Sequence, residues 1–413
     1  MVEKKPPALQ TKPYLMRNSI QNYPWGTRDE NAIIPQLIGE QPEPGKPYAE
    51  LWMGAHPTAP SALLIAGEYH RLDQLIDQYP DFFLGKKLAQ EFKNRLPFLL
   101  KILSVGQPLS IQAHPDKSQA EKLHATAPQH YPDDNHKPEI AIALDQFQAL
   151  VGFKSSRELV EVFTNYPEIA EICDPEIVAK IQTSSSATIA EKQANLKTFF
   201  SHFMHRSQEA ADALKVAIEK LKDRLQTAPK HSPVEALFLA MYGKYRAPDT
   251  GLFSLFFLNL INLQPGEAVF IKAGIPHAYL SGTVIECMAN SDNVVRAGFT
   301  SKFQDKNILH EILTYESGAV SIIGGIGKER KTTYETEAKE FILHKYHLQN
   351  GDNELLDSGK PGIILVLAGK IELMFDTSSE VYHKGQSVLI PACLQNVQVI
   401  AKKESRFYIA TVP

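Results

Sequence analysis

The spacing of apolar residues changes twice along this chain of 413 residues. Up to about residue 153, short apolar runs are broken by Pro, Gly and Asn, a pattern typical of strands joined by turns. From about Ser155 to Tyr245, apolar residues recur at intervals of three and four, which indicates amphipathic helices. Strand signals return from about Leu252. The chain is therefore predicted to be mainly β, with a helical insertion.

One amphipathic stretch, residues 72–92, is also expected to be helical within the first strand-rich part. A degenerate internal repeat appears later. Residues 265–277, PGEAVFIKAGIPH, align without gaps with residues 384–396, KGQSVLIPACLQN. Each copy contains a turn glycine, a short apolar strand and a second turn. Two merely similar strands bounded by glycine would also explain so short a repeat.

Composition is ordinary for a soluble globular protein, with 43% hydrophobic and 22% charged residues. The longest apolar stretch, residues 252–263, contains polar residues and is shorter than the ~20 residues that a membrane span needs. The first residues contain no apolar core of the kind found in signal peptides. A cytoplasmic protein without a membrane partner is expected.

Net charge and cysteine content argue against several kinds of partner and metal site. The formal net charge is -4 and no polybasic block occurs, which argues against nucleic acid. The three cysteines form no CxxC pair, so neither a disulfide framework nor a thiolate zinc site is indicated. A small anionic substrate would need a local cluster of cations, for which the candidates are Lys101, Lys137, Arg296 and Lys302.

Three segments contain residues that are able to bind a metal. Gln112 and His114 lie two apart in LSIQAHPDK, so in a strand both would point to one face. Glu139 opens an apolar strand in NHKPEIAIAL, and His277 lies beside a proline turn in IPHAYLSG. Together they form a set of nitrogen and oxygen ligands with room for substrate. Each histidine could instead have a structural role.

These strings resemble those of the type I phosphomannose isomerases, also called mannose-6-phosphate isomerases, within the cupin superfamily. The resemblance runs from NYPWG at residues 22–26, through ELWMGAHPTAPS at 50–61, to IECMANSDNVVRAGFTSK at 285–302. It implies reversible conversion of mannose 6-phosphate to fructose 6-phosphate through a cis-enediol, feeding GDP-mannose and mannose metabolism. The substrate partner would be a sugar phosphate.

The resemblance also implies one zinc ion per chain, bound by Gln112, His114, Glu139 and His277. It places Arg296 in the active site, close to the C1–C2 end of the sugar. The guanidinium of Arg296 is planar and keeps its charge near neutral pH, so it could polarise a sugar oxygen or grip phosphate.

Further residues are assigned to the substrate. Ser110 and Lys101 match family positions on the phosphate side, and Lys302 is a weaker candidate for the same role. Tyr279 shares a face with His277 and is expected to line the pocket. Asp292 could orient Arg296, serve as an acid or base, or belong to a surface charge network.

The proton-transfer base is left open between Lys137 and Glu286. Lys137 shares the face of Glu139 by strand alternation, although a solvated lysine would also fit. His136 is a candidate for helping to open the cyclic sugar. Trp52 and His56 are expected to be structural.

The implied architecture is two cupin-like jelly rolls with an inserted helical domain. Residues 1–154 and 251–330 would form the metal-bearing catalytic domain, 155–250 the helical insertion, and 331–413 a metal-free C-terminal domain. In the second repeat, Asn396 stands where the first has His277, which is why the C-terminal domain is expected to bind no metal. A monomer is expected.

Two other classes of protein would use a similar barrel. A cupin oxygenase would bind iron through two histidines and a carboxylate, but this reading leaves Gln112 and the cations unexplained. A non-catalytic sugar-binding cupin usually has a DNA-reading module, and no helix-turn-helix with a basic face is recognisable here.

Overall fold

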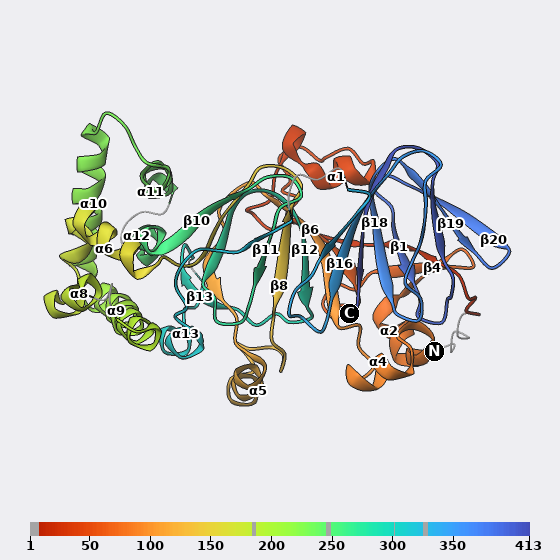
Figure 1. The fold of residues 1–413 in the computed structure, drawn as a ribbon, viewed down its shortest axis with the longest axis horizontal. Helices are drawn as coiled ribbons and strands as arrows, with labels where there is room; N and C mark the ends of the chain where they lie inside the picture. The colour runs from red at the N-terminus through yellow and green to blue at the C-terminus, as the bar shows by residue number, and fades with distance from the viewer. Residues whose placement is uncertain (1–7, 184–186, 245–248, 301, 325–328) are drawn as a thin grey trace.

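The computed structural model describes residues 8–183, 187–244, 249–300, 302–324 and 329–413. Figure 1 shows three regions in a row: a helical region, a first β region beside it, and a second β region at the far end. Antiparallel strands dominate both β regions. The predicted fold class, mainly β with a helical insertion, is confirmed.

The first β region is an eleven-stranded sheet in which β12 is the central strand. The first residues of β12 pair with β7 and β9, and its later residues pair with β6 and β8. Its strands are β2 (Ser19–Gln21), β3 (Glu50–Gly54), β6 (Phe98–Val105), β7 (Ile111–Ala113), β8 (Glu139–Ala143), β9 (Phe147–Phe153), β10 (Leu258–Leu263), β11 (Ala268–Ile271), β12 (His277–Ala289), β13 (Val295–Gly298) and β14 (Ile322–Ile323).

Gly282 lies where β12 changes partners. Its φ is +102°, and an added Cβ would lie 2.5 Å from the carbonyl oxygen of Gln146. Only glycine meets both conditions without strain. This residue therefore allows one strand to serve both sides of the region.

The helical insertion comprises α6 (Ser156–Asn165), α7 (Pro167–Ala170), α8 (Pro175–Gln182), α9 (Ile189–Glu209), α10 (Ala211–Thr227), α11 (Pro233–Lys244) and α12 (Thr250–Phe257). Ser155 and Glu158 form a capping box that starts α6. Helices were predicted across this part of the chain, and Tyr245, where the prediction ends, lies outside the described residues. Phe257 packs against Phe199 and Phe203 of α9, with ring centroids 4.9 and 5.1 Å apart.

The prediction that strands return at Leu252 was wrong, because residues 250–257 form α12 and the strand begins at Leu258. Every residue of α12 is buried. A segment that is apolar all round has no amphipathic period, so its sequence does not distinguish a buried helix from a strand. Asp249 caps this helix by accepting a hydrogen bond from the Gly251 N–H.

The second β region consists of two sheets. The eight-stranded sheet contains β15 (Lys331–Tyr334), β16 (Ile342–Leu348), β23 (Ser405–Thr411), β18 (Gly362–Ala368), β21 (Ser387–Ile390), β1 (Tyr14–Arg17), β4 (Ala62–Ile65) and β5 (Glu68–Arg71). The four-stranded sheet contains β17 (Asn353–Leu355), β22 (Gln398–Ala401), β19 (Lys370–Phe375) and β20 (Ser378–His383). Apolar side chains from both sheets form one core.

N-terminal strands extend the eight-stranded sheet, with Tyr14 of β1 opposite Leu389 of β21. Residues 14–71 thus contribute strands to both β regions. The three-part division of the chain stays a prediction.

The remaining helices are short. They are the 3-10 helix η1 (Asp29–Asn31), α1 (Ile33–Ile38), α2 (Leu72–Gln78), α3 (Pro80–Phe83), α4 (Lys86–Glu91), α5 (Lys117–Thr126) and α13 (Lys306–Ile312). The stretch 72–92 is helical as predicted, although it is divided among α2, α3 and α4. Among the described residues, no helix combines the length and apolar character needed to cross a bilayer.

The two copies of the internal repeat have matching strands. The strand β11 occupies the same place in the first copy as β21 does in the second. Gly266 and Gly385, which precede them, have φ values of +93° and +84°. His277 is the first residue of β12, whereas Asn396 lies in the loop before β22.

Candidate metal centre and active site

The structure brings together the four predicted metal ligands. Gln112 lies on β7 directly opposite His277 of β12, and their Nε2 atoms are 3.4 Å apart. Glu139, the first residue of β8, lies between the histidines: its Oε2 is 3.4 Å from His114 Nε2, and its Oε1 is 3.1 Å from His277 Nε2. Strand register, rather than a continuous motif, creates this cluster.

Hydrogen bonds orient both imidazoles. His114 Nδ1 lies 2.8 Å from the carbonyl oxygen of Asn293, and His277 Nδ1 lies 2.9 Å from that of Ile275. A carbonyl only accepts, so each Nδ1 carries the proton and each Nε2 presents a lone pair toward Glu139. This is the arrangement that a metal-binding histidine needs.

The donor atoms fit a single cation. One ligand atom from each of His114, Glu139 and His277 lies within 4.8 Å of the others. His114 Nε2 is buried and forms no hydrogen bond with a described residue, and buried Glu139 Oε2 has only the Lys137 ammonium as an ion-pair partner. A buried acceptor without a hydrogen bond is costly, and a bound divalent cation would satisfy the His114 nitrogen. A half-turn of the Gln112 amide would add an oxygen ligand.

Electrostatics also favour a cation. Burial, assisted by the neighbouring Lys137, lowers the pKa of His114 to about 4, so the imidazole is neutral near pH 7. Burial opposes ionisation of Glu139, but the neighbouring Lys137 ammonium holds the pKa of this carboxyl well below its ordinary value. Neutral imidazole and ionised carboxylate are the forms that bind metal.

A chain of buried charges extends from the cluster. Lys137 Nζ lies 3.2 Å from Glu139 Oε2, and the Tyr279 hydroxyl donates to Glu139 Oε1 at 3.1 Å. Further along, Lys101 Nζ lies 3.1 Å from Glu286 Oε2 and 3.4 Å from Glu50 Oε2. Because Lys101 on β6 faces Glu286 on β12 in register, the sheet itself creates this ion pair.

The two buried partners Lys101 and Glu286 differ in their electrostatics. Burial works against the charge of Lys101, yet Glu50 and Glu286 raise the pKa of this amine above its ordinary value. Burial raises the pKa of Glu286, and Glu139 adds to this effect while Lys101 opposes it. Glu286 is therefore a carboxyl group whose pKa is raised above its ordinary value, as it is in many acid–base catalysts.

Glu50 was not among the predicted site residues, and Trp52 was expected to be structural. Trp52 Nε1 donates to Glu50 Oε2 at 2.5 Å, and Lys101 Nζ lies 5.0 Å from the Trp52 ring centroid. The two residues stand two apart on β3 and so share a face, the same signal that singled out Gln112 and His114.

Arg296 lies beside the cluster. It sits on β13 opposite Gln112 of β7 and is half-buried. Burial lowers the pKa of its guanidinium, and among the described residues it forms no ion pair. A partly desolvated cation without a counter-charge is suited to an anionic ligand.

Other predicted site residues lie outside this group of buried charged side chains. Ser110 is half-buried just before β7, and Lys302 is exposed. Asp292 is exposed, with Oδ2 located 3.5 Å from His56 Nε2. His136 Nε2 lies 2.7 Å from Oε1 of Glu340, which comes from the C-terminal part of the chain.

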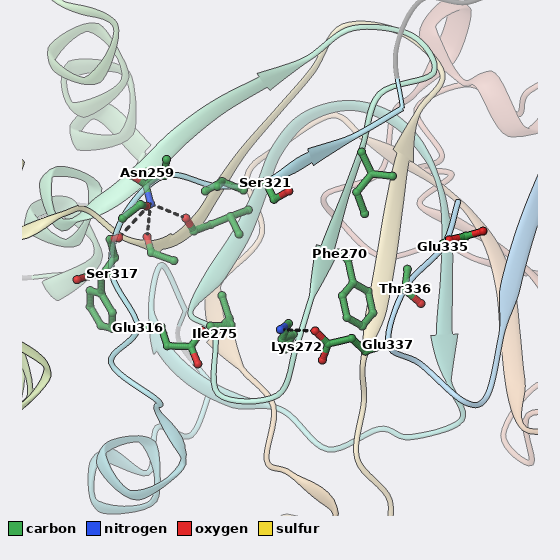
Figure 2. Close-up of a pocket in the computed structure, with 17 residues that line it drawn as sticks. Asn259, Phe270, Lys272, Ile275, Glu316, Ser317, Ser321, Glu335, Thr336 and Glu337 are labelled. Atoms are coloured by element: carbon green, nitrogen blue, oxygen red, sulfur yellow. Dashed lines mark hydrogen bonds and ion pairs between the residues drawn. The ribbon is translucent and has the colours of Figure 1, made fainter. Parts of the chain in front are cut away.

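A separate cavity of about 540 Å³ contains none of the predicted site residues. Figure 2 shows Phe270, Lys272 and Glu337 close together in this cavity, with Lys272 Nζ 2.6 Å from Glu337 Oε1. Asn259 donates from Nδ2 to several backbone carbonyls at its end of the cavity. The predicted metal ligands and the buried charged residues next to them lie elsewhere, so cavity size does not locate the site.

The fold and the site define a jelly-roll protein of the cupin type with a buried candidate metal centre. The model of the family "Phosphomannose isomerase type I, catalytic domain" matches residues 14–156. Mannose-6-phosphate isomerase of Macaca fascicularis is 41% identical over 304 residues, covering 72% of each chain. Mannose-6-phosphate isomerase 2 of Arabidopsis thaliana is 36% identical over 396 residues, covering 92% of this chain and 89% of its own. The chain belongs to the type I phosphomannose isomerase family.

Solved structures agree with this assignment. A zinc-bound mannose 6-phosphate isomerase is 29% identical with a TM-score of 0.82, covering 97% of this chain and 99% of its own. An arginine-to-alanine mutant of phosphomannose isomerase from Salmonella typhimurium is 28% identical with a TM-score of 0.81 and the same coverage. The family resemblance noted in the sequence is thereby confirmed.

Proposed function

We propose that this chain is a zinc-dependent aldose–ketose isomerase that interconverts mannose 6-phosphate and fructose 6-phosphate through a cis-enediol. The observation that carries the proposal is the buried cluster of His114, Glu139 and His277, whose donor atoms lie within 4.8 Å of one another. Membership of the type I phosphomannose isomerases supplies the substrate. The enzyme would be a cytoplasmic monomer feeding GDP-mannose and mannose metabolism.

Gln112, His114, Glu139 and His277 would hold one zinc ion per chain. Bound zinc would supply a Lewis acid that stabilises negative charge on the oxygens at the C1–C2 edge of the sugar. Arg296 would add a second positive contact to the same edge, because it lies opposite Gln112 and has no counter-charge among the described residues. Tyr279 would keep Glu139 oriented through its hydroxyl and line the pocket.

The hydrogen exchanged between C1 and C2 requires a base beside these carbons. Glu286 and Lys137 remain the two candidates. Burial raises the pKa of Glu286 above its ordinary value, which favours it as the group that takes and returns the proton. Lys101, held between Glu286 and Glu50, would fix the position of the Glu286 carboxylate. His136 would assist opening of the sugar ring.

Ser110, Lys101 and Lys302 would hold the phosphate, Lys101 from inside the first β region and Lys302 from its surface, with Asp292 at the rim. The charge of Lys101 is already balanced by two carboxylates, which makes Lys302, an exposed cation, the stronger phosphate contact of the pair. Binding energy from the phosphate would thus be realised away from the reacting carbons.

The direct test is isomerisation of mannose 6-phosphate by the purified protein, with zinc content measured on the same sample. We expect about one zinc per chain, loss of turnover after EDTA, and recovery on adding zinc. Full activity in metal-free protein, or absence of turnover in zinc-loaded protein, would contradict the proposal. Iron with oxygen uptake would indicate an oxygenase, and sugar binding without turnover would indicate a non-catalytic cupin.

A further inference from the structure

Asn293, in the loop between β12 and β13, contacts the cluster in two directions. Its side chain is buried, with 0% exposure. Nδ2 donates to the carbonyl oxygens of Asp133 at 2.7 Å and Asn135 at 2.9 Å, and lies 3.2 Å from Asp133 Oδ1. Its backbone carbonyl accepts the Nδ1 proton of His114 at 2.8 Å. One residue thereby connects a predicted ligand to the turn at 133–135.

The orientation of the Asn293 amide is unambiguous. Two of the three groups around Nδ2 are backbone carbonyls, which only accept, so the amide nitrogen must face them. Oδ1 points the other way and is buried without a hydrogen bond to a described residue. An arrangement that leaves a buried acceptor unsatisfied is costly, and it is maintained here by the bonds on the nitrogen side.

Neighbouring residues reinforce the same connection. The Ser291 hydroxyl donates to the Asn135 carbonyl at 3.0 Å and accepts the Asn293 backbone N–H at 3.1 Å. The Asp292 backbone N–H donates to Asp133 Oδ2 at 2.7 Å. The loop 291–293 is therefore fixed to the turn 133–135, which leads directly into Lys137 and Glu139.

We infer that Asn293 is a positioning residue for the metal centre. The Asn293 side chain hydrogen-bonds to the turn at 133–135 and so fixes the Asn293 backbone carbonyl beside His114. This carbonyl keeps the proton on His114 Nδ1, with His114 Nε2 facing Glu139. The same hydrogen bonds position the start of β8, where Glu139 lies. This inference rests on the proposed zinc site and adds a residue that would control its affinity without touching the ion.

Asn293→Asp is the sharpest variant, because it keeps the shape and replaces the donor with a carboxylate facing three acceptors. Partners of metal-binding histidines typically change metal affinity by about 10–100-fold, so we expect the zinc dissociation constant to rise at least about tenfold. Ser291→Ala removes a weaker part of the same connection, so it should raise the zinc dissociation constant by a smaller factor than Asn293→Asp does. If Asn293→Asp does not fold, Ser291→Ala still tests the inference.

Asn290→Asp is the matched control. The Asn290 side chain donates from Nδ2 to the Leu96 carbonyl at 2.6 Å, and its Oδ1 is likewise buried without a partner among the described residues. This side chain touches none of the proposed ligands, so the same substitution should lower thermal stability while leaving the zinc dissociation constant at the wild-type value.

The experiment titrates zinc into the metal-free, full-length proteins against a chromophoric chelator, alongside thermal unfolding. Cobalt(II) absorption spectra report the geometry of the ligands independently of activity. Weaker zinc binding and an altered cobalt spectrum in Asn293→Asp, with Asn290→Asp like wild type, would support the inference. Wild-type affinity and spectrum in both Asn293→Asp and Ser291→Ala would overturn it. Failure of the wild-type protein itself to bind zinc would overturn the metal centre and this inference together, a visibly different result.

Discussion

The two copies of the internal repeat have the same local fold and different ends. In each, a glycine with positive φ precedes a four-residue strand, β11 in the first and β21 in the second. The first copy ends in His277, which is fully buried, and the second in Asn396, which is exposed with a φ of +54°. The shared strand and turn therefore do not create the site.

The two β regions also differ in the side chains that they bury. Lys101, Glu139 and Glu286 are buried within the first region. The core between the sheets of the second region consists of apolar side chains such as Ile364, Ile371 and Phe407. Burying charges costs free energy. We therefore expect the apolar core of the second β region to contribute more to stability than the charged interior of the first.

The largest effect is expected from replacing the terminal residue of the first copy of the repeat, with the terminal residue of the second copy as the control. His277→Ala should remove zinc and lower kcat/KM by about a thousandfold or more, since a bound metal contributes several kcal/mol. Asn396→Gly, which suits the positive φ, should leave both unchanged. Metal analysis and steady-state kinetics check both variants. Retained zinc in His277→Ala would show that the first copy is not the metal-bearing one.

The next largest effect is expected at Arg296, a cation of the first β region that forms no ion pair with a described residue. Arg296→Lys keeps the charge and loses the planar pair of donors, so kcat should fall about a hundredfold while KM changes little. Zinc content should stay normal. Arg330→Lys, on the surface of the second region, is the control and should behave as wild type. A rise in KM with unchanged kcat would instead assign Arg296 to phosphate binding.

Sequence reasoning succeeded where one strand held the information. Gln112 and His114 share a face because side chains alternate along β7 and its continuation. That Glu139 and His277 join them depends on pairing between distant strands, which no local pattern specifies and which only the family resemblance supplied. The link between Asn293 and His114 was missed for the same reason, since a backbone carbonyl leaves no trace in the sequence.

Two other differences between the predicted and the observed fold have physical causes. The helix α12 was mistaken for a strand because its buried apolar residues have no period. The pairing of Tyr14 with Leu389 places the first strand of the chain in the second β region. Such long-range pairing is set by the whole sheet, whereas the apolar run around Tyr14 predicts only that a strand exists.

A smaller effect is expected from the apolar core of the second region. Ile364→Val removes one buried methyl group and should lower the free energy of unfolding by about 1 kcal/mol. Zinc affinity and kcat should be unchanged, because this core touches no proposed ligand. Val381→Ala, at an exposed site, should have almost no effect on unfolding by denaturant. A change in kcat with Ile364→Val would mean that the second region is more than a scaffold.

The smallest effect is expected in the helical insertion, where Glu168 forms a two-pronged ion pair with Arg224. Arg224 Nε lies 2.6 Å from Oε1 and Nη2 lies 2.9 Å from Oε2 of Glu168. Burial opposes ionisation of Glu168, but Arg224 lowers the pKa of the carboxyl below its ordinary value. A carboxyl with a lowered pKa in the folded state stabilises the protein above its unfolded pKa of about 4.3. This contribution is lost as the pH falls through the folded value.

Glu168→Gln should therefore destabilise the protein at about pH 7 by about 1 kcal/mol or less, because the Arg224 side chain is 44% exposed and its charge is screened by water. The difference from wild type should shrink as the pH falls below about 4, since the wild-type carboxyl then becomes protonated. Glu171→Gln, which breaks the exposed pair with Lys220, is the control and should cost less. Denaturant unfolding at both pH values measures these differences. A gap that stays constant with pH would show that Glu168 acts through packing and not through its charge.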